Sequence, residues 1–222
     1  MEDDGEDAGH RPSLARRAPI SRRHVRTYIG LGANLGEAAA TLTNGIRALG
    51  ALPGATVRGV SRLYATTPVG VVDQPEFRNA VVALDVPSGT DPQTGALTLL
   101  VALKQLERAF GRRDRERWGP RELDLDLLVF GRVRLAIERP PEGMSLDRGK
   151  AETLLVVPHR DAAERLFVLA PLADLAAGLV PPGWEHTVEW YRRRREALEG
   201  ADAVRPLARW DPQRRDWVAI TD

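Results

Sequence analysis

Hydrophobic and polar positions divide this chain into short alternating runs and longer helical ones. RTYIGLGAN is a short β-prone run that ends in a Gly-rich turn and predicts a first strand, and TVRGVSRLYAT and RNAVVALDV are expected to be the second and third. Helical periodicity predicts one helix in EAAATLTNGIRALG and a second in DPQTGALTLLVALKQLERAF, with Asp91 as N-cap and Pro92 at the first helical position. A fourth strand begins near Leu123, and RVRLAIER is expected to be its hairpin partner across Gly131.

The later segments extend this pattern. TLLVVPHRDAAERLFVLAPLADLAAG predicts a short strand, a turn at Pro158 and His159, and short helices, and EWYRRRREALEG predicts a charged helix. The order β-α-β-β-α-β with extra strands is typical of a ferredoxin-like α+β sandwich, in which two helices cover one face of an antiparallel sheet. The other face is then expected to be free to carry a functional site.

Changes in composition along the chain predict three parts. Residues 1–25 have no hydrophobic periodicity and are expected to form a disordered tail. Residues 26–183 are expected to form the folded domain, with a surface insertion at 139–151. Residues 184–222 are expected to form a C-terminal helix and a tail.

Composition narrows the class of protein. The 222 residues are 43% hydrophobic and 28% charged, as in a globular protein, and no apolar run reaches the roughly 18 residues of a membrane span. The N-terminus lacks the apolar stretch of a secretory signal, and the absence of cysteine excludes disulfides and thiol chemistry. We therefore expect a cytoplasmic protein. A net charge of +1 argues against nonspecific nucleic-acid binding.

The segment RWGPRELDLDLLVFG places two like charges side by side. Leu123, Leu125, Leu127 and Val129 are expected on one face of its strand, with Asp124 and Asp126 on the other, their Cα atoms roughly 6.5–7 Å apart. Burying such a pair without partners costs several kcal/mol. Three explanations remain open here: a solvent-exposed face, pairing with nearby arginines, or shared divalent cations. With oxygen ligands and no cysteine, magnesium is favoured over zinc.

The loop before this strand is rich in arginine. Each arginine alone is explained by solvation, but together they could converge on phosphate oxygens. Carboxylates that hold Mg²⁺ beside arginines that bind phosphates are recurrent parts of phosphoryl-transfer sites. The combination therefore favours metal-assisted phosphoryl transfer. The residues concerned are Arg112, Arg113, Arg115, Arg117 and Arg121.

Four ordered blocks of sequence resemble one enzyme family. RWGPRELDLDLL, YIGLGANLG, YATTPVGVVDQPEFRNAVVAL and VPHRDAAERLFVLAPLADLA are similar to the motifs of 6-hydroxymethyl-7,8-dihydropterin pyrophosphokinase, over about residues 27–180. The resemblance implies a ferredoxin-like fold. It also implies transfer of the β,γ-diphosphate of ATP to the pterin hydroxymethyl group, with release of AMP, in folate biosynthesis. ATP and this pterin are the partners it implies, and we expect a monomer.

The resemblance also implies roles for individual residues. Two Mg²⁺ ions would be held by Asp124 and Asp126, and Arg112 and Arg121 would stabilise charge on the transferring group. The loop tryptophan Trp118 would close over ATP. The residues implied to bind ATP are Glu107, Trp118, Arg121, His159 and Arg165. From the residues alone, an ordinary exposed helix side chain is the less favoured alternative for Glu107, whereas a lone histidine after proline, such as His159, is more often structural.

Pterin recognition is implied at a second set of residues. Phe77 and Phe167 would stack on the ring and Asn79 would hydrogen-bond its edge, although both phenylalanines alone would be read as core residues. The loop with Thr66, Pro68 and Val69 would offer backbone groups to the ring. Loops 65–76 and 110–122 are expected to close over the substrates.

This sequence departs from the family pattern at several positions. Phe77 stands where many members have tyrosine, and Leu154 and Val156 replace an arginine and a threonine that help to bind adenosine. The insertion and the residues after about 185 have no counterpart in compact members. Two alternative functions stay open at this point: an RNA-binding module, since ferredoxin-like sheets also bind RNA, and a non-catalytic homologue.

Overall fold

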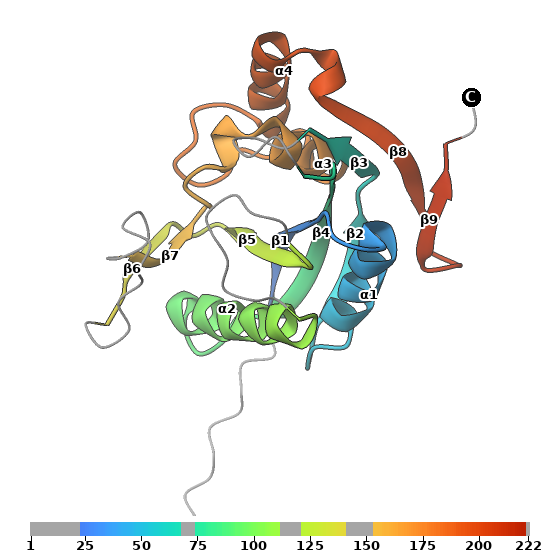
Figure 1. Cartoon of the computed structure of the whole chain (residues 1–222). Coiled ribbons are helices and arrows are strands. Elements are labelled where there is room, and N and C mark those ends of the chain that lie inside the picture. The colour runs from blue at the N-terminus through green and yellow to red at the C-terminus, as the bar shows by residue number, and fades with distance from the viewer. Residues whose placement is uncertain (1–22, 68–73, 112–120, 141–152, 221–222) are drawn as a thin grey trace, which may run out of the picture.

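A computed structural model describes residues 23–67, 74–111, 121–140 and 153–220 (Figure 1). The strands are β1 (His24–Ala33), β2 (Thr56–Val60), β3 (Leu63–Thr66), β4 (Phe77–Pro87), β5 (Asp124–Phe130), β6 (Leu135–Glu138), β7 (Thr153–Val157), β8 (Val204–Asp211) and β9 (Asp216–Ala219). The helices are α1 (Ala38–Gly50), α2 (Pro92–Ala109), α3 (Leu166–Ala176) and α4 (Val188–Glu199), with short 3-10 turns η3 (Ala162–Glu164) and η4 (Ala201–Ala203).

The main sheet is antiparallel and runs in the order β5-β1-β4-β3-β8-β9, with β2 also paired to β4. Its register aligns Asp124 of β5 with Gly32 of β1, Gly32 with Asn79 of β4, and Asn79 with Tyr64 of β3. Directly paired residues of neighbouring strands point to the same face of a sheet. These four residues therefore form one row across a single face.

Helices α1 and α2 cover the opposite face (Figure 1). Between them and the sheet lies the larger core, built on fully buried residues such as Ile29, Leu42, Leu84 and Leu103. Helix α2 begins as its sequence predicts, because the side chain of Asp91 accepts a 2.9 Å hydrogen bond from the amide of Thr94. These two layers make an α+β sandwich of the ferredoxin-like kind.

The other face is only partly open, which corrects the expectation that it is free. Helix α3 is apolar, and its Leu169 and Leu172 are fully buried in a second cluster with Val81 and Leu128 of the sheet. Helix α4 packs on α3 (Figure 1). The part of this face near Asp124 and Asn79 is where half-buried polar residues remain.

Strand β5 contains a bulge. Tyr28 pairs with Val129 and Ile29 with Leu127, so Leu128 has no partner on β1. An extra residue reverses the alternation of side chains beyond it. Val129 consequently joins the α3-side cluster, and the prediction that it shares a face with Leu125 and Leu127 was wrong.

One prediction of strand pairing and one of strand number also differ from the structure. Strand β6 pairs with β7 in a separate two-stranded sheet instead of forming a hairpin with β5. On the outer edge of β5, the amide of Leu125 donates a hydrogen bond to the side chain of Glu107 of α2. The segment TVRGVSRLYAT is two strands, β2 and β3, separated by Ser61 and Arg62.

The C-terminal segment predicted as a tail contains the hairpin β8–β9. Strand β8 pairs with β3 and so extends the main sheet (Figure 1). Trp210 and Trp217 stack edge to face with ring centroids 5.0 Å apart, and Asp216 accepts a 2.9 Å hydrogen bond from Thr43 of α1. Over the described ranges, the structure contains no helix with the length and hydrophobicity of a membrane span.

Candidate functional site

The two carboxylates of β5 lie on the partly open face. Asp124 is half-buried and forms an ion pair with the guanidinium of Arg121, three residues earlier. Asp126 is also half-buried, and its carboxylate makes no hydrogen bond or ion pair with another described residue. Of the three explanations for the pair, arginine therefore accounts for Asp124 in this structure. The carboxylate oxygens of Asp126 remain available to bind a cation.

Two glycines of β1 form the floor beside these carboxylates. Gly30 pairs with Asp126 and Gly32 with Asp124, and on their other side they pair with Val81 and Asn79. A Cβ atom added at Gly32 would lie 3.1 Å from Oδ1 of Asn79. Side chains are thus missing where they would fill the space between Asp124 and Asn79, a span of two strands or roughly 10 Å.

Asn79 is the buried polar residue at the far side of this floor. It is 7% exposed, and its Nδ2 donates a 2.8 Å hydrogen bond to the hydroxyl of Thr66. Its Oδ1 has no partner among the described residues. Phe77 lies two residues before Asn79 and pairs with Thr66, so all three side chains share a face. The structure thus brings together three of the residues expected to bind the pterin.

Asn34, which the sequence analysis did not single out, joins two segments of the site. It is 3% exposed, its Oδ1 accepts a 2.8 Å hydrogen bond from the amide of Arg121, and its Nδ2 donates to Gln74 Oε1 at 3.0 Å and to the Pro75 carbonyl at 3.2 Å. The available signal was a lone asparagine directly after the GLGA strand end. Such a residue commonly hydrogen-bonds nearby backbone groups.

Glu107 is buried, which excludes the reading of an exposed helix side chain. It is 1% exposed, and Oε1 accepts from the amide of Leu125 at 2.8 Å and from Lys104 Nζ at 2.9 Å. The carboxylate therefore satisfies the outer edge of β5 between the two aspartates. In this structure, Glu107 holds β5 in place against α2.

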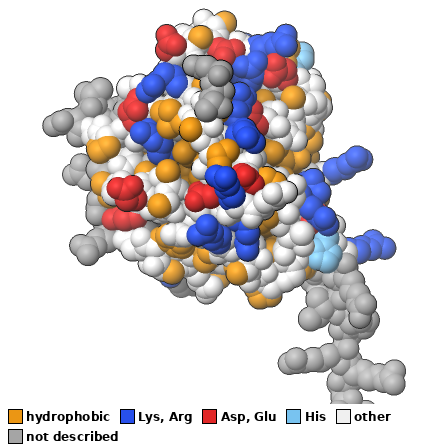
Figure 2. Space-filling model, turned by 90° about the vertical axis from the view of Figure 1, so that its right-hand side faces the viewer, with side chains coloured by type: hydrophobic (Ala, Val, Ile, Leu, Met, Phe, Trp, Pro, Cys, Tyr) orange, Lys and Arg blue, Asp and Glu red, His pale blue; other side chains and the backbone are white. Residues whose placement is uncertain are grey.

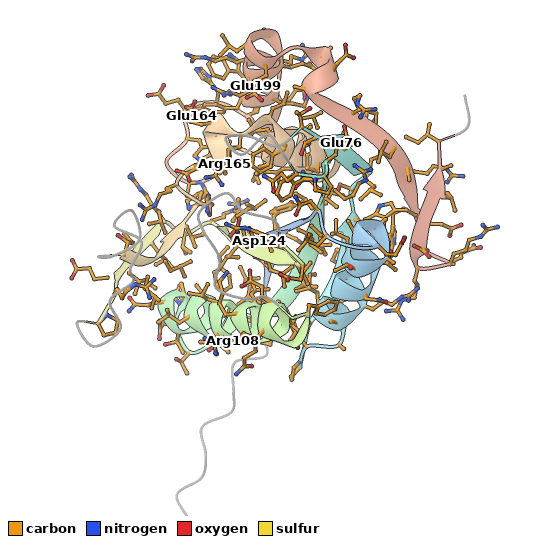
Figure 3. The ribbon with its side chains drawn as sticks, in the orientation of Figure 1. Glu76, Arg108, Asp124, Glu164, Arg165 and Glu199 are labelled. Atoms are coloured by element: carbon orange, nitrogen blue, oxygen red, sulfur yellow. The ribbon has the colours of Figure 1, made fainter. Side chains whose placement is uncertain are left out.

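The segment before α3 carries two further residues expected to bind ATP. Arg165 donates to Asp161 at 2.5 Å, and its guanidinium carbon lies 5.8 Å from the ring centre of Phe167. His159 donates its backbone amide to the carbonyl of Leu128, the bulged residue, at 2.9 Å. In Figure 3, Asp124 lies on β5 in the middle of the molecule and Arg165 lies above it, on the side of α3. Both positions belong to the partly open face.

Several predicted site residues lie outside the described residues. These are Pro68, Val69, Arg112 and Trp118, together with Arg113, Arg115 and Arg117. Loops 65–76 and 110–122 are expected to close over the substrates, and most of their residues, 68–73 and 112–120, also lie outside the described residues.

A Mg²⁺ site can be judged from the donors present. In the described part of the chain, no three His, Asp or Glu side chains are grouped as metal ligands. Asp124 and Asp126 supply carboxylate oxygens on one strand face. Mg²⁺ is commonly held by one or two carboxylates together with substrate phosphates and water. The donor set therefore fits Mg²⁺ that binds with a nucleotide.

The fold and the site define an α+β protein whose sheet carries a carboxylate pair, a glycine floor and a buried amide. The sequence profile of the family described as 7,8-dihydro-6-hydroxymethylpterin-pyrophosphokinase (HPPK) matches residues 28–177. The chain belongs to this family. The resemblance suggested by its motifs is confirmed, and the alternative of an RNA-binding module is not supported.

Individual relatives agree with this assignment. The 2-amino-4-hydroxy-6-hydroxymethyldihydropteridine pyrophosphokinase of Pseudomonas aeruginosa is 40% identical over 164 residues, covering 74% of this chain and 88% of that protein. The protein of the same name from Methylorubrum extorquens is 39% identical over 162 residues, covering 72% of this chain and 87% of its own length.

A solved structure supports the fold. Wild-type HPPK-DHPS of Plasmodium falciparum matches with a TM-score of 0.65 and 12% identity over 89% of this chain. The chain spans about half the length of that longer protein, since 50% of it is covered.

Proposed function

We infer that this chain transfers diphosphate from ATP to the hydroxymethyl group of 6-hydroxymethyl-7,8-dihydropterin, giving AMP and the pterin diphosphate in folate biosynthesis. Family membership supports the reaction. The observation that carries it to this site is the row from Asp124 through Gly32 to Asn79, which puts acidic and amide groups on one face with open backbone between them.

At the pterin end, we propose that Asn79 reads the ring edge. Its Oδ1 can accept from a ring N–H, while its bond to Thr66 fixes the orientation of the amide. Phe77 and Phe167 would stack on the two ring faces. Phe167 is half-buried at the start of α3 and Phe77 half-buried at the start of β4. A satisfied buried amide and aromatic contact together give orientation as well as affinity.

At the phosphate end, we propose that Asp124 and Asp126 hold two Mg²⁺ ions that arrive with ATP. The ions would neutralise phosphate charge and polarise the transferring group. Arg121 must then exchange Asp124 for phosphate oxygens, which keeps a positive charge beside the group that develops negative charge. Arg165 and His159 would contact the nucleotide from the same face. No covalent intermediate is needed, because positioning and charge neutralisation supply the catalysis.

The test is an incubation of the protein with ATP, Mg²⁺ and 6-hydroxymethyl-7,8-dihydropterin, followed by AMP. We expect AMP to form only when pterin and metal are both present, and Asp124→Ala and Asp126→Ala to abolish turnover while the thermal melting temperature changes little. Absence of AMP with the unchanged protein would mean a non-catalytic homologue. Near-normal turnover by either variant would remove the metal assignment.

A further inference from the structure

The C-terminal extension, α4 with β8 and β9, contacts the strands and helix that carry the predicted pterin residues. It lies after the residues matched by the family profile, which end at 177. We propose that Val204 and Arg205 of this extension are positioning residues for the pterin end of the site. The proposal rests on the proposed function, because it concerns the same pterin site.

Strand pairing brings the extension directly to Thr66. Strand β3 has four residues, and along all four it pairs with β8, with Thr66 opposite Val204 and Ala65 opposite Arg205. Without β8, this short strand would be an edge of the sheet and would lose one of its two ladders of hydrogen bonds. Thr66 orients the amide of Asn79, so the pairing also fixes the group expected to read the ring.

Packing brings the extension to Phe167. Val204 is 8% exposed and forms a small hydrophobic cluster with Tyr64, Leu166 and Ala170, against which Phe167 packs. A cavity of about 400 Å³ adjoins this cluster and is lined by Val204 among other residues. A gap left by truncating Val204 would merge with this cavity instead of closing by collapse. The support under Phe167 therefore depends on the valine side chain.

An ion pair brings the extension to Phe77. Arg205 Nη2 lies 2.6 Å from Oε1 of Glu76, whose other oxygen lies 3.3 Å from Arg78 Nη1. The hydrogen bond from Arg205 lowers the pKa of Glu76 below its usual value. Arg205 is half exposed, so this ion pair contributes little to the overall stability of the fold. The effect of this pair is local, on the residue that precedes Phe77.

Helix α4 supports the same region from a second side. Arg195 Nη1 lies 3.2 Å from Glu164 Oε2, just before α3 begins, and Val188 is fully buried beneath α3. Figure 2 views the molecule from the right-hand side of Figure 1, where β8 and β9 lie, and shows acidic and basic side chains interspersed with small apolar areas. Among the described side chains of this face, no broad apolar patch of the kind that marks a docking surface is visible.

Val204→Ala tests the proposal, with Val86→Ala as matched control. Val86 is 4% exposed on β4, at the end distant from Asn79, so both variants lose the same two methyl groups from a buried site. We expect Val204→Ala to raise KM for the dihydropterin about 3- to 10-fold, with kcat and KM for ATP within about twofold of the unchanged protein. Val86→Ala should lower the melting temperature similarly and leave both KM values unchanged. Identical KM values in the two variants would overturn the proposal.

Arg205→Ala provides a second test that does not depend on a buried site. Its control is Arg209→Ala, an exposed arginine on the same strand whose partner lies on β9. We expect a pterin KM about 2- to 3-fold higher for Arg205→Ala, partial recovery in Arg205→Lys, and no change for Arg209→Ala. Equal behaviour of the two alanine variants would refute the role of Arg205. If the unchanged protein forms no AMP, the proposed function fails, whereas an active protein with unaffected variants contradicts only the positioning role.

Discussion

Asn34→Ala should lower both the stability and the catalytic activity of the protein, because this side chain joins two segments of the candidate site. The substitution removes three hydrogen bonds: one accepted from the amide of Arg121 and two donated to Gln74 and Pro75. The backbone bond from the amide of Asn34 to the Arg121 carbonyl, at 3.1 Å, remains. The variant therefore isolates the contribution of the side chain.

The cost follows from the groups that lose their partner. A buried polar group left unsatisfied costs about 1–3 kcal/mol. Arg121 is half-buried and Pro75 exposed, so water can replace the partner of Pro75 more easily, and we expect a total of about 2–3 kcal/mol. For a chain of this size each kcal/mol corresponds to about 2–4 °C in melting temperature, which gives a decrease of about 4–12 °C.

Thermal unfolding and steady-state kinetics measure the two effects. Well below the melting temperature, we expect kcat/KM to fall at least about tenfold, because Arg121 loses its fixed position relative to residues 74–75. Asn34→Asp, which keeps the acceptor for Arg121 and loses the donors, should be intermediate. Asn44→Ala is the control, since Asn44 is exposed on α1 and its side chain, among the described residues, accepts a hydrogen bond only from Arg47, at 3.3 Å. If Asn34→Ala behaves like Asn44→Ala in both assays, the reasoning is refuted.

Three further predictions concern other parts of the chain. Gly32→Ala should weaken binding of a pterin analogue, because its Cβ crowds Asn79; Gly30→Ala, which meets only a flexible leucine at 3.5 Å, should not. Glu107→Leu should lower the free energy of unfolding by about 1–3 kcal/mol, since an edge amide of β5 loses its acceptor, whereas Glu107→Gln should retain most of it. Arginines 192 and 193 lower the pKa of Glu189 from 4.5 to about 2, so its stabilisation is present above pH 4.5 and lost towards pH 2, and Glu189→Gln should remove this part of the acid-unfolding curve.

The fold was predictable where signals are local. Asp91 as N-cap and Pro92 at the first helical position mark the start of α2, and short runs of β-prone residues mark β1 and β4. The partner of β6 was not predictable, because it depends on competition between β7 and β5 for the same strand. The bulge at Leu128 was hidden for a similar reason: an uninterrupted apolar run gives no sign of where a strand changes phase.

The site was predictable to the extent that its motifs carry chemistry. Asp124, Asp126 and Asn79 were singled out because charge or amide in an apolar strand requires an explanation, and the register places Asp124 and Asn79 in one row. Asn34 was missed, since its partners lie 40 and 87 residues away along the chain. The hairpin β8–β9 was missed because its pairing with β3 bridges more than 130 residues of sequence.

The bulge at Leu128 separates the two carboxylates of β5 from the residues that follow it along the strand. Asp124 and Asp126 precede Leu128, so a gain or loss of one residue beyond it would change which leucines enter the α3 layer without moving either carboxylate. The position of His159 does depend on the bulge, because its backbone amide donates a hydrogen bond to the carbonyl of Leu128. In relatives without the bulge, the two aspartates should keep their register with β1, whereas the backbone of this histidine should shift relative to them.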